Sequence, residues 1–425
     1  MRDKTFTLLK GLGILLVVLA HASAPIYLGR FAYMINVPVF FIFAGYMFKT
    51  SYLQDKTAFV VSRFRRLYFP FVRWSILFLL LHNLLFPLGL LSEQYGNAAG
   101  GVTHPYSWAQ AAQHLWSIVF NMSGYDPFLA GAFWFFRALL LSSLSFLALF
   151  YLSTRFQRLR GSMLQVGTII VLMLALATWL AIDQLKITGV AQGGYRELMG
   201  VAFMGIGFLL RHDETQNPST PIAKPLFGLG AGIVVLTPLV IWLPVSMSTR
   251  PAGIGSVYAL FVAGTAGFLL LRALSHYLQL LPDKVLRPLL YLGDNTLYVF
   301  AFHLLAFKLV SALKVGVYGL PWGMVGGHPV VQHAKDDFFW MLYTLVGTAV
   351  PLLWIWAWRR LCERHNFKTE TPSDWLRIVV RLSIMLYQLF VRMLIAMGRG
   401  IVAFGKGTLQ TIKDILAASN PKEEE

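Results

Sequence analysis

Long apolar runs, separated by short polar segments, follow one another along most of the chain. A helix needs about 20 apolar residues to cross a hydrocarbon core of about 30 Å. Runs of roughly that length lie at 7–27, 31–48, 68–91, 133–152, 164–182, 195–210, 225–245, 254–272, 288–310 and 338–358. The sixth run is short, and we expect its helix to tilt or to pack deep in the bundle. The pattern predicts an all-α fold, a polytopic membrane bundle of about ten transmembrane helices.

The C-terminal part of the chain has a different pattern, so we divide the protein into a transmembrane domain at 1–358 and a tail at 359–425. In the tail, Arg377, Arg381, Arg392 and other basic residues punctuate apolar stretches such as LSIMLYQLFV. This spacing predicts an amphipathic helix that lies on the anionic inner leaflet of the membrane. The alternative is an eleventh spanning helix, which would place Arg392 deep in lipid.

Composition and charge support a membrane protein. Of the 425 residues, 57% are hydrophobic and 13% are charged, and the formal net charge is +17. In a soluble chain this charge would suggest a nucleic-acid partner, but here the positive-inside rule and anionic lipid explain it, so we expect no nucleic acid. With the N-terminus inside, 28 of the 36 Lys and Arg residues fall on cytoplasmic segments, and both termini are predicted to be cytoplasmic.

Cys362 is the only cysteine, which excludes an intramolecular disulfide.

The N-terminus also has the features of a secretory signal. MRDKTFTLLK precedes an apolar run that ends in the small-residue sequence AHASA. Cleavage after Ala24 would place Pro25 first, which obstructs the signal peptidase, whereas cleavage after Ala22 stays open. We favour an uncleaved first helix.

Lys10 and His21 share the first apolar run, LLKGLGILLVVLAHASAP. Eleven residues at about 100° each make three turns and about 20°, so the two side chains point the same way, about 16.5 Å apart along the helix. Ionisable groups in a membrane helix are costly and often functional. The structural alternative is that Lys10 snorkels to the inner interface and His21 is a hydrogen-bonded interior group. Their shared face favours a functional pair.

A second basic group lies in SRFRRLYFPFVRW, where Arg63 and Arg66 are three residues apart and share a helix face. We expect them at the cytoplasmic entrance to the third helix. Guanidinium groups bind phosphate oxygens bidentately, so with Lys10 they suit a phosphorylated donor from the cytoplasm. On charge alone a topological role is the stronger interpretation.

Two later helices carry further polar groups. Arg137 lies about one turn inside the fourth helix, in GAFWFFRALLLSS, and the ninth helix contains Asn295, Tyr298 and His303 in YLGDNTLYVFAFHLLAF. Such residues are expected to point into the bundle and to hydrogen-bond there. Each could contact an acceptor or stabilise an oxyanion, and each has a structural alternative, which for Arg137 is snorkelling outward.

Other signals are weak. Residues 92–132 hold no Lys or Arg, and with 311–337 they form aromatic outer segments that suit either sugar stacking or an interfacial belt. HPVVQH has no carboxylate or Cys at ligand spacing, so no metal site is expected. We detect no repeat between the two halves, which weakens a transporter interpretation.

Five motifs occur together: LLKGLGILLVVLAHA, VPVFFIFAGYMF, RFRRLYFPF, FWFFRALLL and YLGDNTLYVFAFH. In this order, over roughly residues 5–305, they resemble membrane acyltransferase family 3, the polysaccharide O-acetyltransferase and nodulation-factor acetylase type. By motif match, Lys10 and His21 correspond to the essential first-helix pair, and Arg63 and Arg66 to the Arg-x-x-Arg pair. The family often carries Arg where this chain has Lys10, and a lysine keeps the charge but loses the bidentate fork.

The resemblance implies an enzyme that moves an acyl group, usually acetyl, from cytoplasmic acyl-CoA to a hydroxyl of a cell-surface or lipid-linked carbohydrate, with no metal cofactor. It implies that Lys10, Arg63 and Arg66 hold the phosphates of acyl-CoA, and that His21 acts as a general base or carries the acyl group. We expect a multi-pass protein of a bacterial plasma (inner) membrane. The alternatives are a transporter or flippase for a lipid-linked sugar, a membrane sensor, or an acyltransferase for another group such as succinyl. The oligomeric state stays open.

Overall fold

A computed structural model of the chain describes residues 4–92, 94–96, 104–156, 161–187, 191–251, 253–334 and 337–365, together with 388, 392 and 395. Within these residues the regular structure is helical, and no strand occurs there. The α-helices are α1 (Lys4–His21), α2 (Ile26–Ile35), α3 (Pro38–Tyr46), α4 (Lys56–Arg63), α5 (Phe69–Leu85), α6 (Trp108–Asn121), α7 (Trp134–Ser153), α8 (Ser162–Ile182), α9 (Tyr195–Gln216), α10 (Pro225–Trp242), α11 (Ile254–Leu278), α12 (Asp283–Asp294), α13 (Thr296–Tyr318) and α14 (Phe339–His365). Short 3-10 helices are η1 (Thr50–Leu53), η4 (Ala191–Gly194), η5 (Pro221–Ala223) and η6 (Trp322–Gly326), and η2 (Phe64–Tyr68) is π-helical.

The chain divides into two compact units, residues 1–353 and 354–425. The predicted tail was placed at 359–425, but its first residues continue α14 to His365. Nearly all of the predicted amphipathic helix lies outside the described residues.

Nine helical segments of the described chain are long and apolar enough to span a membrane. This confirms the predicted polytopic bundle. The difference from about ten concerns α9, which is longer than the predicted run at 195–210 and ends in the charged sequence RHDETQ. Although α9 falls outside the nine, 12 of its residues are buried, so it forms part of the interior.

Two close backbone approaches fix α9 against α3. A Cβ atom on Gly45 would lie 1.9 Å from the carbonyl oxygen of Met204, and one on Gly207 would lie 2.0 Å from the carbonyl oxygen of Ile42. These distances are too short for any side chain, so only glycine permits the two helices to pack this closely.

Three predicted spans are interrupted or shifted. The run at 31–48 is two helices, α2 and α3, because Pro38 cannot continue the backbone hydrogen bonds of α2. The run at 288–310 is also two, since α12 ends at Asp294 and α13 begins at Thr296. The third span begins earlier than predicted, at Lys56, and continues through α4, η2 and α5 to Leu85. Arg63 and Arg66 lie in the first half of this helical segment.

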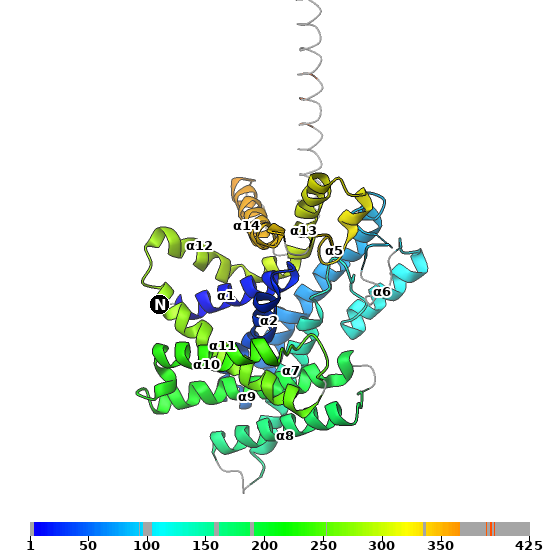
Figure 1. Cartoon of the computed structure of the whole chain (residues 1–425). Helices are drawn as coiled ribbons and strands as arrows, with labels where there is room; N and C mark the ends of the chain where they lie inside the picture. Colours follow the sequence, from blue (N-terminus) through cyan, green and yellow to red (C-terminus); the bar gives the residue numbers. More distant parts are fainter. Residues whose placement is uncertain are drawn as a thin grey trace, which may run out of the picture. The chain divides into compact units, whose positions relative to one another are not determined.

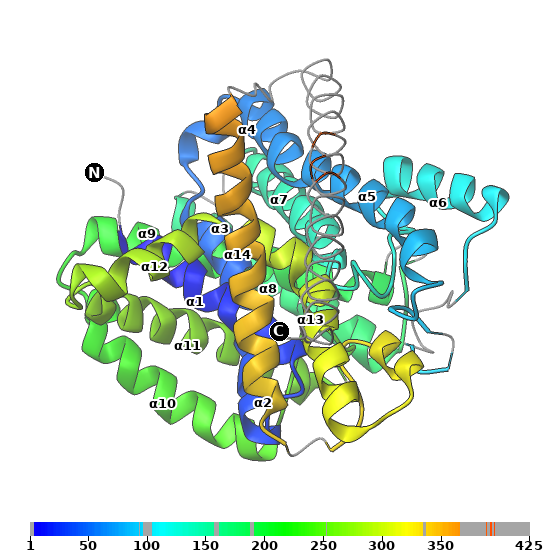
Figure 2. The ribbon, with the colours of Figure 1, turned by 90° about the horizontal axis from the view of Figure 1, so that it is seen from above.

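The segment 92–132, which we predicted to lie on the outer side, contains helix α6. It lies beside α5 in both views (Figure 1, Figure 2). Ser107 and Gln110 form a capping box at its start. Trp108 and Trp116 are 93% and 63% exposed, as an interfacial aromatic belt requires.

Candidate active site

Helix ends, a helix break and the π-helical segment η2 together line one cavity. It has a volume of about 140 Å³ and is lined by Ile14, Val17, His21, Tyr33, Asn36, Val37, Phe40, Arg66, Leu67, Ala132, Trp134, Phe135, Phe136, Ser248, Thr296, Leu297 and Phe300. The end of α1, the break between α2 and α3, the π-helical segment η2, the start of α7 and the start of α13 all contribute. Breaks and π-helical segments free backbone and side-chain groups from regular packing, which is why they recur at functional sites.

His21 is held in one tautomer by its neighbours. Its Nδ1 atom lies 2.9 Å from the carbonyl oxygen of Val17 and 3.3 Å from Nε2 of His303. Nδ1 of His303 lies 3.1 and 3.0 Å from the carbonyl oxygens of Val299 and Phe300. A carbonyl oxygen only accepts, so both Nδ1 atoms carry the proton in the neutral rings. Nε2 of His21 is then the basic nitrogen.

His303 is fully buried behind His21 and does not line the cavity. With its own proton directed at the two carbonyl groups, Nε2 of His303 accepts from Nδ1 of His21. The ring centroids are 5.1 Å apart. This geometry suits a residue that orients the His21 ring, which differs from the predicted contact with the acceptor.

Arg66 shares the cavity with His21 and is itself exposed, so it lies where the cavity opens. Arg63 packs against the side chain of Phe59, with its guanidinium carbon 4.7 Å from the ring centroid. Its Nε atom is buried and has no hydrogen-bond partner among the described residues. A buried donor without a partner is costly, and a bound anion would satisfy it.

Lys10 is half-buried on α1 and does not line the cavity. Beside it, α1 meets α12 backbone to backbone, since a Cβ on Gly11 would lie 3.2 Å from the carbonyl oxygen of Leu289. The predicted axial spacing places Lys10 about 16.5 Å from His21 along α1.

The remaining predicted residues lie around the cavity and not on its wall. Asn295 joins α12 to α13, is buried, and donates from Nδ2 to the carbonyl oxygen of Tyr291 at 2.8 Å. Tyr298 packs edge-on against Trp74 with ring centroids 6.3 Å apart. Arg137 lies close enough to Tyr125 to oppose the rise that burial causes in the pKa of that phenol.

Sequence reasoning missed several residues of the cavity wall, of which Asn36 and Trp134 are the most informative. Asn36 is buried where α2 ends, and its Oδ1 atom accepts from the backbone N–H of Val37 at 2.7 Å. Its position two residues before Pro38 was a readable signal, since a proline ends the preceding helix and frees polar groups there. Trp134 begins α7 and gave no signal of its own.

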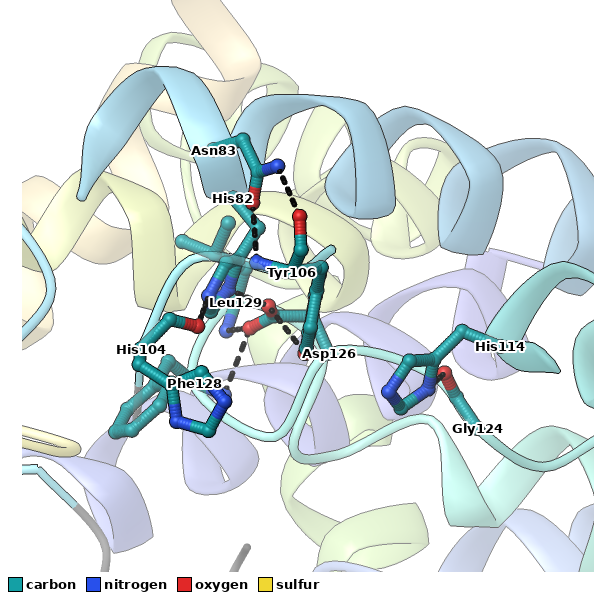
Figure 3. A network of polar contacts seen from close by, with 9 residues as sticks. All are labelled: His82, Asn83, His104, Tyr106, His114, Gly124, Asp126, Phe128 and Leu129. Atoms are coloured by element: carbon teal, nitrogen blue, oxygen red, sulfur yellow. Dashed lines mark hydrogen bonds and ion pairs between the residues drawn. The ribbon is translucent and has the colours of Figure 1, made fainter. Parts of the chain in front are cut away.

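A second polar cluster is buried where α5 meets the segment 104–129 (Figure 3). Nδ1 of His82 lies 2.5 Å from Oδ2 of Asp126, and its Nε2 donates to the carbonyl oxygen of His104 at 2.9 Å. The Tyr106 ring stacks on His82 with centroids 4.0 Å apart. Oδ1 of Asp126 accepts from the backbone N–H groups of Phe128 and Leu129. The cluster thereby ties the segment before α7 to α5.

Two buried lysines on α13 stabilise the segment that follows that helix. Lys308 donates to the carbonyl oxygens of Val325 and Gly327 at 3.2 and 2.7 Å. Lys314 forms an ion pair with Asp337 at 2.7 Å. Buried charges of this kind need such partners.

Comparison with known proteins identifies the family of the chain. The family model of the acyltransferase domain matches residues 3–327, which cover every element of the cavity. Neither a curated protein nor a solved structure matches the chain. The matched region includes the first-helix histidine, the Arg-x-x-Arg pair and the helices around them. The chain belongs to membrane acyltransferase family 3.

Proposed function

We propose that this membrane acyltransferase moves an acetyl group from acyl-CoA to a hydroxyl of a cell-surface or lipid-linked carbohydrate. One observation carries the proposal: His21, whose Nε2 is the basic nitrogen, and Arg66 line a single cavity. A site that joins a base to a phosphate-binding cation in this way suits a phosphorylated thioester donor.

The donor is proposed to bind from the cytoplasmic side of a bacterial inner membrane, with both protein termini on that side. Arg66 at the mouth of the cavity and the unsatisfied Nε of Arg63 beside it bind the phosphates of acyl-CoA. Lys10 contributes a further positive charge. The long pantetheine arm then reaches from these cations to His21, which brings the thioester carbonyl into the cavity.

The reaction is a direct acyl transfer. Nε2 of His21 takes the proton of the acceptor hydroxyl while the hydroxyl oxygen bonds to the carbonyl carbon of the thioester. The carbon–sulfur bond breaks, and the thiolate of CoA takes the proton from the His21 imidazolium. The products are the carbohydrate ester and CoA, and His21 returns to its starting state. His303 positions His21 by accepting from Nδ1.

A transfer assay distinguishes this enzyme from a transporter or flippase. Membranes that contain the protein are incubated with acetyl-CoA labelled in the acetyl group, and the carbohydrate fraction is counted. An acetyltransferase labels the carbohydrate above the level in membranes without the protein. A transporter leaves that fraction unlabelled, which would overturn the proposal. Labelled succinyl-CoA tests the other acyl group in the same assay.

The donor site has its own test. The double variant Arg63→Ala and Arg66→Ala is expected to weaken acyl-CoA binding, because it removes both guanidinium groups of the proposed phosphate site. Arg65→Ala is the matched control, since Arg65 is exposed in the same segment and does not line the cavity. If the double variant binds acyl-CoA with unchanged affinity, Arg63 and Arg66 do not bind the donor and serve only to orient the protein in the membrane.

A further inference from the structure

We propose that Trp134 is the platform on which the sugar ring of the acceptor stacks, and that Arg196 holds this platform in place. The inference rests on the proposed function and assigns the acceptor side of the same cavity. Trp134 lines the cavity together with His21, so a ring stacked on the indole lies in the same space as the base.

Arg196 lies against the Trp134 ring and outside the cavity. Its guanidinium carbon is 3.8 Å from the ring centroid, and Arg196 is not among the residues that line the cavity. The Trp134 side chain thus contacts the Arg196 guanidinium and also lines the cavity. One ring face is covered by a cation, which is a favourable contact for tryptophan, and the ring remains available to a ligand on its cavity side.

Arg196 is itself rigidly held. It is buried on α9, its Nε donates to the carbonyl oxygen of Met247 at 3.0 Å, and an Nη atom donates to the carbonyl oxygen of Ser248 at 2.8 Å. Ser248 also lines the cavity. The Arg196 side chain thus connects α9, α7 and the segment between α10 and α11. These contacts fix the position of the Trp134 ring relative to the rest of the cavity wall.

The other polar groups on the cavity wall suit a neutral, hydroxyl-rich ligand. Tyr33, Asn36, Ser248 and Thr296 offer hydroxyl and amide groups, which exchange hydrogen bonds with sugar hydroxyls. An aromatic face attracts the weakly positive C–H groups of a pyranose ring. A wall of this composition, with an indole beside a base, fits a sugar better than it fits an acyl chain alone.

The adenine of CoA is the other ring that could stack on an indole. The proposed donor geometry argues against it, because the pantetheine arm separates the adenine from the thioester. With the thioester carbonyl beside His21, the adenine lies beyond the mouth of the cavity. Kinetics can separate the two ligands, since each has its own KM.

The test compares Trp134→Ala and Trp134→Phe with Trp242→Ala, a control at an exposed tryptophan on α10. In purified protein, Trp134→Ala is expected to raise the KM for the acceptor glycan about tenfold, the loss of one aromatic stack. The KM for acetyl-CoA, whose proposed phosphate site is Arg63 and Arg66, is expected to stay at the wild-type level. Trp134→Phe keeps a smaller ring and is expected to give an intermediate acceptor KM, which carries the test if the alanine variant does not fold.

Arg196 is tested as a positioning residue. Arg196→Gln removes the cation and is expected to raise the acceptor KM, whereas Arg196→Lys restores part of the effect. An unchanged acceptor KM in both Trp134 variants overturns the inference, and a raised acetyl-CoA KM instead would assign the indole to adenine. A wild-type protein that transfers no acetyl group would refute the proposed function itself, so the two failures are distinguishable.

Discussion

Gly293 on α12 is the point where a single methyl group should disturb both the packing of the bundle and its cavity. A Cβ on Gly293 would lie 1.9 Å from the carbonyl oxygen of Thr7 on α1. Three residues later Thr296 reaches the cavity wall, and α1 ends at His21 on the same wall. The substitution Gly293→Ala therefore forces apart two helices that position the reacting groups.

The size of the effect follows from the geometry. Ordinary van der Waals contact begins at 3.4 Å, so α1 and α12 must separate locally by roughly 1.5 Å. The atom in the way is backbone, which no rotamer change can move. Overpacking of this kind costs about 1–3 kcal/mol and lowers the thermal midpoint by a few degrees. A misplacement of about 1 Å at reacting groups costs about 100-fold in rate.

The assay is thermal unfolding of the purified protein together with its acetyl transfer rate. Gly316→Ala on α13 is the control, because nothing lies within 4 Å of a Cβ built there. It should leave the rate unchanged and hold or slightly raise the midpoint, since alanine is the better helix former. Wild-type midpoint and rate in Gly293→Ala would show that α1 and α12 do not meet in this way.

Three further predictions concern polar groups outside the cavity wall. Asp126→Asn should destabilise the protein by about 1–3 kcal/mol, measured as a lower thermal midpoint, because the His82 hydrogen bond loses its charged acceptor. Lys314→Met should cost about 1–3 kcal/mol by removing the cation paired with the half-buried Asp337, which keeps its hydrogen bonds from the Tyr318 hydroxyl and the Phe339 N–H. Adding Asp337→Leu should recover part of that loss in the same assay. Burial and the nearby Lys308 charge lower the pKa of His328 from 6.5 to about 3. The neutral ring then stabilises the fold fully above pH 6.5, and this stability is lost as the pH falls toward 3. At pH 5 the loss is about 2 kcal/mol, so the midpoint of His328→Gln should fall less between pH 7 and pH 5 than that of the wild type.

The bundle was largely predictable because hydrocarbon thickness sets the length of a spanning helix. What the pattern of apolar residues could not provide is the position of breaks inside an apolar run. Pro38 was a local signal for the break after α2. The boundary at Asn295 carried a weaker signal in the sequence GDNT, whose residues favour helix ends. The π-helical segment at Arg66 depends on packing against α7 and other distant parts of the chain.

Sequence reasoning selected candidate site residues where an ionisable group stands alone in an apolar run. This rule selected His21 and His303, which the structure brings together. The same rule applied to LLLHNLL and AFKLV would have selected His82 and Lys308 as well. Their partners could not be read from sequence, because Asp126 and Gly327 lie far from them along the chain and meet them only in the folded bundle.

The rate of acetyl transfer from acetyl-CoA to the carbohydrate in His21→Ala tests the central claim most directly. The control is His276→Ala, at an exposed histidine near the end of α11. If His21 is the base, its loss should lower the rate by about 100- to 10,000-fold while the control keeps the wild-type rate. A near-normal rate in His21→Ala would contradict the claim, because no step of the reaction would then depend on that nitrogen.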